Sequence, residues 1–119
     1  MIARRGATLK PRLRLVRGGT IVLGPGKADL LESVRATGSL RKAAAGLGMS
    51  YMRAWTLVKT MNDSFSRPLV ALARGGARHG GATLTPAGSR VLALYRAMEA
   101  ACVKATSSQA TALRRFLRT

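Results

Sequence analysis

The residues best suited to chemistry lie on one side of a helix that the sequence predicts over about 50–64. Arg53, Thr56 and Lys59 recur at every third position, which places them on neighbouring parts of the helix surface. Their guanidinium, hydroxyl and ammonium groups can bind phosphates and the polar edges of nucleic-acid bases. The chain's four carboxylates show no paired arrangement for acid–base catalysis, and no Ser, His and Asp cluster is evident. The pattern favours binding, and we expect no enzyme activity.

The opposite side of the same helix is apolar. Ala54, Val58, Met61 and Phe65 recur at steps of four, three and four residues, which predicts a stripe that faces the core. Ser50 stands just before the helix and is a typical N-cap residue. The sequence therefore predicts a helix with a buried stripe and a polar outer face.

A short helix and a tight turn precede this segment. The short helix is predicted from Leu40 to about Gly46, with Ser39 as its N-cap and Gly48 in the turn that follows. Two helices joined by such a turn indicate a helix-turn-helix, in which the second helix presents its outer face to the major groove of DNA.

A two-stranded wing is predicted after the second helix. Residues 69–74 and 82–84 are predicted as strands, and the glycine-rich segment 75–82 forms the tip between them. Another helix is predicted to begin at Pro86 and to carry an apolar stripe as far as Cys102. The order helix, turn, helix, wing is typical of proteins that bind DNA.

Two further elements are predicted before the helix pair. Apolar and basic residues alternate on both sides of Gly18 and Gly19, which predicts a β-hairpin. A helix is predicted over 27–36, with a stripe that contains Ala28, Leu30, Leu31 and Val34. The expected fold class is therefore mainly α with a small β wing, a winged helix-turn-helix, with a second hairpin near the N-terminus.

The charge of the chain predicts a polyanionic partner. There are 21 Lys and Arg residues against 4 Asp and Glu, a formal net charge of +17. Such a field attracts nucleic acid, and double-stranded DNA is the expected partner. No apolar run is long enough to span a membrane, and residues 1–10 lack the apolar core of a signal peptide. A cytoplasmic, nucleoid-associated protein without a membrane partner is expected.

The predicted DNA-binding residues fall into groups with different roles. Those expected to contact base edges are Arg53, Thr56 and Lys59. Those expected to bind phosphates are Arg41, Lys42, Arg74 and Arg78. The other members of the predicted site are Ser50, Tyr51, Met52 and His79. For Trp55, packing in the core is favoured over stacking on DNA.

No cofactor or metal site is expected from the sequence. Cys102 is the single cysteine, which excludes an internal disulfide and a cysteine-based metal site. His79 is the single histidine and has no second histidine or cysteine to share a metal ion.

Taken together, these motifs resemble the N-terminal domain of the ModE family, molybdate-dependent regulators with a LysR-type winged helix. The resemblance covers residues 13–102. Its main feature is Ser-Tyr-x-x-Ala-Trp at 50–55, combined with the glycine-rich wing and the helix start at 86–88. The other matching segments are Gly38-Ser39-Leu40, Ala43-Ala44, Gly48-Met49 and Met61-Asn62.

The resemblance implies a homodimer that pairs through the first and last helices and binds a palindromic operator with two recognition helices. Complete members of the family also carry C-terminal β-barrel domains that bind molybdate. This sequence stops at Thr119 and shows no Ser-Ala-Arg-Asn oxyanion segment. DNA binding is therefore expected to carry over, whereas molybdate binding by this chain is not expected.

Three regions are expected along the chain. These are a basic flexible arm over 1–10, a winged helix-turn-helix domain with a C-terminal dimerisation helix over 11–105, and a basic tail over 106–119 that can be helical. The expected function is sequence-specific DNA binding by a homodimeric transcription regulator, with residues 50–64 in the major groove and the wing, 74–84, on the backbone or minor groove. The residues leave three alternatives open: a non-specific nucleoid protein, a dimerising adaptor and a direct oxyanion sensor.

Overall fold

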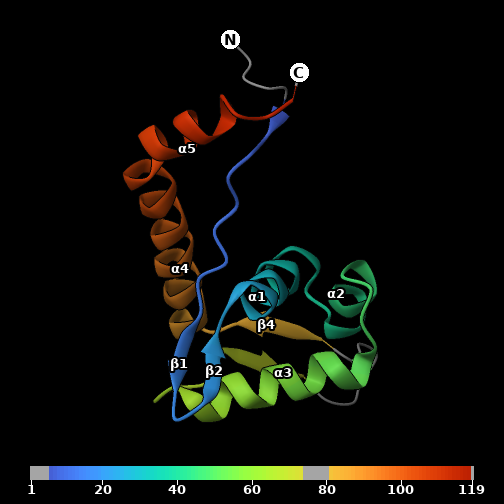
Figure 1. Cartoon of the computed structure of the whole chain (residues 1–119). Coiled ribbons are helices and arrows are strands. Elements are labelled where there is room, and N and C mark those ends of the chain that lie inside the picture. The colour runs from blue at the N-terminus through green and yellow to red at the C-terminus, as the bar shows by residue number, and fades with distance from the viewer. Residues whose placement is uncertain (1–5, 74–80, 119) are drawn as a thin grey trace.

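The computed structural model describes residues 6–73 and 81–118. Its helices and strands, in chain order, are β1 (Leu15–Arg17), β2 (Thr20–Leu23), α1 (Pro25–Thr37), α2 (Leu40–Gly46), α3 (Tyr51–Ser64), β3 (Val70–Leu72), β4 (Ala82–Leu84), α4 (Pro86–Ala105) and α5 (Ser107–Arg114). Helices α1, α2 and α3 form a compact body, and α4 leads away from it to α5 (Figure 1). The predicted fold class, a winged helix-turn-helix that is mainly α with a small wing, is confirmed.

The core lies where the three-helix body meets the wing and α4. Its largest fully buried side chains come from α1, α2, α3, α4 and the loop before β3, and they are Leu30, Leu31, Val34, Leu40, Val58, Met61, Leu69 and Leu92. The predicted stripes of α1 and α3 are buried as expected, except that Phe65 is only partly buried. Burial of these apolar side chains is the main stabilising contribution to the domain.

Two separate antiparallel hairpins flank the helices. In the first, β1 and β2 are joined through Gly18 and Gly19, whose φ angles are 57° and 80°. Two consecutive left-handed residues form the tight turn that suits a two-residue hairpin, and glycine adopts this conformation without steric cost. In the second, β3 pairs with β4 so that Val70 lies opposite Leu84 and Leu72 opposite Ala82. Both predicted hairpins are therefore present.

The side chain of Asn62 joins α3 to the wing. Its Oδ1 accepts hydrogen bonds from the backbone N–H groups of Leu69 at 2.8 Å and Val70 at 3.2 Å. Its Nδ2 donates to the backbone oxygen of Val70 at 3.0 Å. One amide thus satisfies three polar groups of the segment that enters β3, and it fixes that segment against the C-terminal half of α3.

The same segment is fixed from the other side by the start of α4. The Thr85 hydroxyl donates to the Pro68 carbonyl at 2.7 Å, and it accepts from the Gly88 N–H at 3.0 Å as the N-cap of α4. Gly88 lies directly on the Leu69 backbone, where an added Cβ would come within 2.0 Å of the Leu69 carbonyl oxygen. Only glycine permits this close approach between α4 and the loop.

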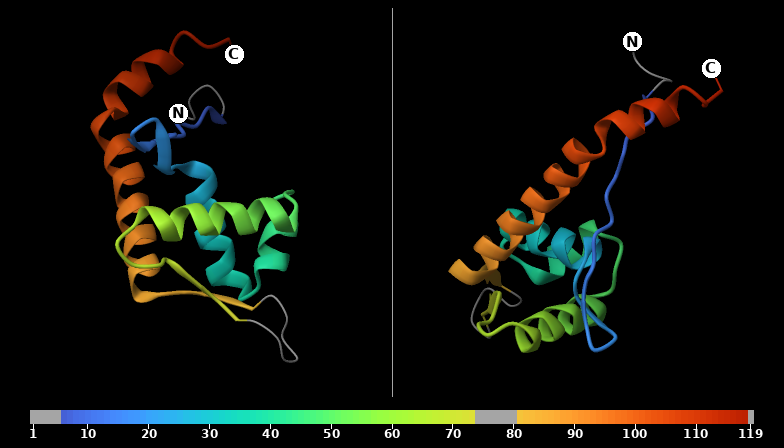
Figure 2. Two further views of the ribbon diagram at one scale, coloured as in Figure 1. Left: turned by 90° about the horizontal axis from the view of Figure 1, so that it is seen from below. Right: turned by 60° about the vertical axis from the view of Figure 1, so that its left-hand side comes forward.

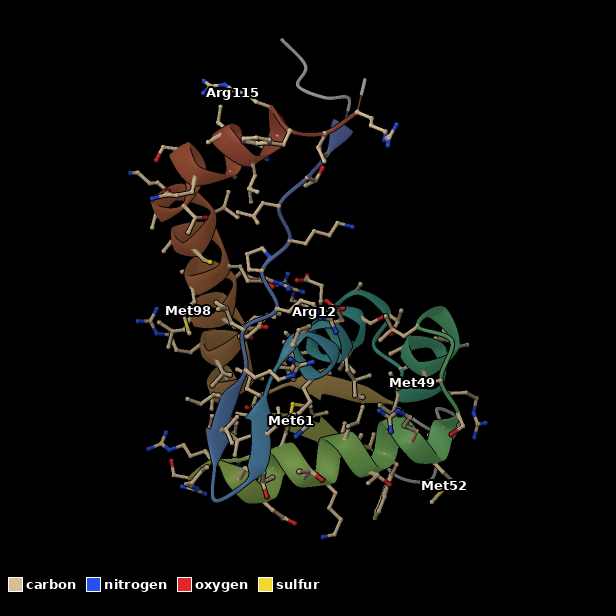
Figure 3. The ribbon with its side chains drawn as sticks, viewed as in Figure 1. Arg12, Met49, Met52, Met61, Met98 and Arg115 are labelled. Carbon is tan, nitrogen blue, oxygen red and sulfur yellow. The ribbon has the colours of Figure 1, made fainter. Side chains whose placement is uncertain are left out.

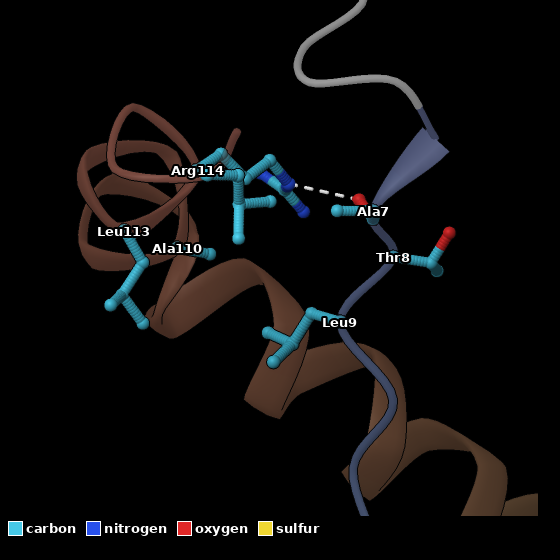
Figure 4. A pocket seen from close by; sticks show the side chains of 7 residues that line it. Ala7, Thr8, Leu9, Ala110, Leu113 and Arg114 are labelled. Atoms are coloured by element: carbon cyan, nitrogen blue, oxygen red, sulfur yellow. Dashed lines mark hydrogen bonds between the residues drawn. The ribbon is translucent and has the colours of Figure 1, made fainter. Parts of the chain in front are cut away.

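The N-terminal segment 6–14 runs back along α4 to α5 (Figures 1 and 2). The Tyr95 hydroxyl donates to the Leu13 carbonyl at 2.7 Å, and Arg114 donates through Nε to the Ala7 carbonyl at 2.9 Å. Leu9 and Leu113 border a small apolar hollow between this segment and α5 (Figure 4). The predicted tail, 106–119, is helical over Ser107–Arg114.

Among residues 6–73 and 81–118, no helix combines the length and the apolar character needed to cross a bilayer.

We predict that Asn62→Ala lowers the free energy of unfolding by about 1–3 kcal/mol, because it leaves the N–H groups of Leu69 and Val70 without an acceptor. Urea denaturation followed by circular dichroism measures this change. Thr60→Ala is the matched control, because the Thr60 hydroxyl bonds only within α3, to the Thr56 carbonyl. Equal losses in the two variants would show that Asn62 has no special bridging role.

Candidate nucleic-acid interface

Two serine caps set where the helices of the pair begin. The Ser39 hydroxyl oxygen accepts from the Lys42 N–H at 3.1 Å, and the Ser50 hydroxyl oxygen accepts from the Arg53 N–H at 3.1 Å. Between the helices, Gly48 takes a φ of 69°, a left-handed conformation that closes the turn after α2. These local interactions fix the start of α3 and hence the direction in which its outer face points.

The outer face of α3 brings together the residues predicted for base contact. Arg53, Thr56 and Lys59 are all exposed, and Met52 beside them is 64% exposed. Seen from below, α3 lies in front of the other helices (Figure 2, left). Met52 lies on the outer side of α3, whereas Met61 points into the body (Figure 3). The face therefore combines cationic, hydroxyl and apolar groups in reach of a partner.

Polar groups on this face keep some of their bonding capacity. The Thr56 hydroxyl donates to the Met52 carbonyl at 2.9 Å, which leaves its oxygen able to accept another bond. The ammonium group of Lys59 lies 3.4 Å from a carboxylate oxygen of Asp63, and both side chains are exposed. An exposed pair of this kind contributes at most about 1 kcal/mol. Lys59 can therefore exchange Asp63 for a stronger acceptor at little cost.

The residues at the N-terminal end of α3 form a second group. The Arg41 guanidinium carbon lies 4.8 Å from the centre of the Tyr51 ring, a cation–π arrangement between α2 and α3. Arg41 and Lys42 are exposed, and Tyr51 is half-buried. The structure thus places Arg41 against Tyr51, which follows the cap residue Ser50, and Lys42 lies beside Arg41 in the first turn of α2.

The structure describes the part of the wing next to the helices, which consists of β3 and β4 with Ala73 and Gly81. The Ala73 N–H donates to the Gly81 carbonyl at 2.8 Å, and the Ala82 N–H donates to the Gly38 carbonyl at 3.0 Å. These bonds hold the wing beside the turn between α1 and α2. The three wing residues of the predicted site lie outside the described residues, and they are Arg74, Arg78 and His79.

Trp55 differs from its sequence-based expectation. Its side chain is 38% exposed, and it borders a shallow hollow of about 220 Å³ with Lys59 and Leu72. Core packing was the wrong expectation because the buried stripe of α3 is narrow and the short strand β3 covers only part of the neighbouring flank. An exposed aromatic ring beside Lys59 adds a stacking surface to the interface.

Three of the chain's four acidic residues gather around one arginine, away from α3. Arg96 of α4 lies 3.2 Å from Asp29, 3.5 Å from Glu32 and 3.0 Å from Glu99. Partial burial acts to lower the pKa of Arg96, but hydrogen bonds to Glu99 and Asp29 outweigh it and the pKa is raised. These three acids therefore form ion pairs where α1 meets α4. Most basic side chains elsewhere in the described residues have no carboxylate beside them.

Among the described residues, no group of three or more His, Cys, Asp or Glu side chains is arranged to hold a metal ion.

The fold and its exposed cationic helix define a DNA-binding protein of the winged helix-turn-helix class. Residues 27–89 match the family model described as bacterial regulatory helix-turn-helix protein, lysR family. The chain belongs to this family. The matched region extends from α1 to the first turn of α4, so it contains the whole helix pair and the wing.

Two bacterial proteins of the molybdenum-related group are similar in sequence to a large part of this chain. The molybdenum-pterin-binding protein MopB of Rhodobacter capsulatus is 43% identical over 86 residues, which are 72% of this chain and 32% of MopB. The molybdenum transport protein ModE of Azotobacter vinelandii is 43% identical over 70 residues, 59% of this chain and 26% of that protein. The chain thus spans about a third or less of the length of these relatives.

A solved structure shares the fold. The CbnR_DBD chain in the crystal structure of a CbnR_DBD–DNA complex superposes with a TM-score of 0.56 and 25% sequence identity. The match covers 73% of this chain and 95% of that chain.

We predict that Ser50→Ala lowers the free energy of unfolding by about 1 kcal/mol, because α3 loses its N-cap. Ser50→Asp restores the cap and should return the stability to that of the parent chain, as measured by urea denaturation. The same aspartate introduces a negative charge at the end of α3, so we expect it to weaken duplex binding in a fluorescence anisotropy titration. A Ser50→Ala chain as stable as the parent would contradict the capping role.

Proposed function

We propose that this chain binds double-stranded DNA sequence-specifically as a homodimer and regulates transcription, acting at the nucleoid in the cytoplasm. The main support is the exposed outer face of α3. Ser39 caps α2 and Ser50 caps α3, and this helix pair lies beside the wing. A B-form major groove is wide enough to admit one helix in this position. In the proposal, the wing contacts the backbone or the minor groove. No enzymatic reaction is part of it.

The roles of the side chains follow from their positions. Arg53, Thr56 and Lys59 contact base edges, because they project from the part of α3 that would lie deepest in the groove. The neighbouring contacts to phosphates and sugars come from Arg41, Lys42, Ser50, Tyr51 and Met52, together with Arg74, Arg78 and His79 of the wing. Phosphate contacts position the protein, and only the base-edge contacts select a sequence.

The homodimer is supported by an apolar stripe on α4. Leu94 is 47% exposed and Met98 is 50% exposed, and Ala101 and Ala105 continue their line at spacings of four, three and four residues. Side chains at this spacing form one apolar seam along a helix, as in paired helices. In the proposal, two copies of α4 pack along this seam and place the two copies of α3 on two half-sites of one operator.

We assign the molybdenum chemistry in the names of the relatives to parts of those proteins that this chain does not match. The match covers 26–35% of MopB, MopA and the Azotobacter ModE. In this chain, the residues that match the family model include the helix pair and the wing. The proposal therefore contains DNA binding and no molybdate site.

A non-specific nucleic-acid-binding protein is the second candidate, and the formal charge of +17 favours it. Such a protein would bind all duplexes with similar affinity, because contacts to phosphates carry no sequence information. Selection of bound duplexes from a random pool, followed by competition with random DNA, distinguishes the two candidates. A sequence-specific regulator prefers its selected site by about 10³-fold or more.

We predict that Lys59→Gln reduces this preference by about 1–3 kcal/mol, because it removes a base-edge contact. Competition titrations with the selected and random duplexes measure the preference for each variant. Lys104→Gln, an equal change of charge near the C-terminal end of α4, should leave the preference unchanged. If both variants weaken binding to all duplexes by the same factor, Lys59 contributes charge alone and sequence reading by α3 is contradicted.

We predict that the double variant Leu94→Asp/Met98→Asp is monomeric, because it places two carboxylates on each side of an apolar seam. Sedimentation equilibrium measures the mass, and circular dichroism verifies that the helices remain. Leu113→Asp is the control, since Leu113 is an exposed apolar residue on α5, outside the seam. A dimer that survives the α4 substitutions but dissociates with Leu113→Asp would place the interface on α5 instead.

A further inference from the structure

A basic hollow lies on one flank of α3 and is not explained by the helix pair or the wing. Its volume is about 360 Å³, and it opens between the β1–β2 hairpin, the start of α1 and the N-terminal half of α3. Its wall contains four basic side chains, and they are Arg12, Arg14, Lys27 and Arg53. Arg12 and Met49, which border the hollow, are labelled in Figure 3.

Among the described residues that line this hollow, none carries a carboxylate. Three of the four acids of the chain contact Arg96, and the fourth, Asp63, pairs with Lys59 on the outer face of α3. Arg12 also borders a neighbouring hollow that contains Asp29 and Glu99, and Arg53 is shared with the outer face of α3. Arg14 and Lys27 are therefore the basic side chains that are specific to this hollow. Like charges gathered in a concave site raise the local concentration of anions.

The local structure holds two of these side chains in place. The Lys27 ammonium group donates to the Ile21 carbonyl of β2, and partial burial lowers the pKa of Lys27. Gly24 is buried beneath Arg14, where an added Cβ would lie 3.3 Å from the Arg14 Cγ and 3.4 Å from the Ile21 Cγ2. A glycine at this position therefore lets the Arg14 side chain lie close over the chain that enters α1.

The hollow also has a definite position relative to the proposed groove helix. Arg53 projects from the flank of α3 that also carries Thr60 and Ser64. Arg17, at the hairpin turn, donates to the Ser64 carbonyl at 3.3 Å and so ties the hairpin to the C-terminal end of α3. Trp55 lies on the opposite flank, beside β3 of the wing. The two hairpins therefore lie on the two sides of α3.

A helix in the major groove has a sugar–phosphate strand on each side of it. We propose that the hollow between the β1–β2 hairpin and α3 binds a backbone phosphate of the DNA strand on that side, opposite the strand that the wing approaches. The inference rests on the proposed function. The first hairpin then acts as a second wing, and the operator is gripped on both walls of the groove. A free oxyanion has the same chemistry, and the experiment separates the two sources.

The test uses the duplex selected from the random pool and copies of it that each carry one neutral methylphosphonate linkage. The parent chain should lose affinity at each contacted phosphate, and one of these linkages in each half-site should lie on the strand beside the β1–β2 hairpin. The double variant Arg14→Gln/Lys27→Gln should show no further loss at that linkage, since its phosphate contact is already gone. The magnitude of the slope of log affinity against log salt should fall by about 1.8 for the dimer, roughly 0.9 for each phosphate.

The matched control is Lys104→Gln/Arg115→Gln, which removes the same number of charges from α4 and from the residue that follows α5. It should keep the methylphosphonate profile and the salt slope of the parent chain. If the double variant does not fold, Arg14→Gln alone is used in its place. This single variant keeps the hydrogen bond from Lys27 to the Ile21 carbonyl.

Two results would overturn the assignment while the proposed function stands. One is a double variant that binds the duplex with the full methylphosphonate profile of the parent chain. The other is saturable binding of sulfate or molybdate at constant ionic strength, measured by calorimetry and lost in Arg14→Gln/Lys27→Gln, together with an unchanged DNA profile. If the parent chain binds no duplex at all, the proposed function fails and this assignment is overturned with it.

Discussion

The arrangement of the domain depends on how the segment from Pro68 to Val70 is held between two helices. Asn62 bonds to it from α3, and Thr85 bonds to it from the start of α4. Val70 enters the β3–β4 pair and the Leu69 carbonyl accepts from the Thr85 N–H, but the other backbone groups of the segment need hydrogen-bond partners as well. The Asn62 amide and the Thr85 hydroxyl supply them. They also fix three parts relative to one another: the outer face of α3, the base of the wing and the direction of α4.

The acidic and the basic side chains of the molecule lie mostly in different places. Few carboxylates are present, and three of them are used where α1 meets α4, around Arg96. Basic side chains elsewhere therefore keep their positive field, which extends over the helix pair and the β1–β2 hairpin. Asp63 is the exception, because it lies on the outer face of α3 and pairs with Lys59. In the proposed complex, a negative charge there would repel phosphates and would favour contact of Lys59 with a base.

The sequence was sufficient for features set by local interactions. Ser50 as a cap, the stripe of Ala54, Val58 and Met61, and the turn at Gly18 and Gly19 follow from short-range rules, and the structure has all of them. Features that depend on distant segments were not predictable. The exposure of Trp55 depends on how far β3 extends, and the basic hollow joins residues separated by about forty positions in the chain. The contacts assigned to DNA stay predictions.

In the proposed dimer, the contact at Gly88 would affect the spacing of the two half-sites that it binds. With 20 residues, α4 is about 30 Å long, and a glycine packed against the Leu69 backbone sets its angle to the body. Because the apolar seam lies about 9–25 Å along the helix from Gly88, a tilt of about 5° there would displace the seam by about 1–2 Å. That displacement is a sizeable part of the roughly 3.4 Å of duplex length occupied by one base pair. Because Gly88 has no Cβ, α4 can pack directly against the Leu69 backbone, and this packing would set the distance between the two copies of α3 in a dimer.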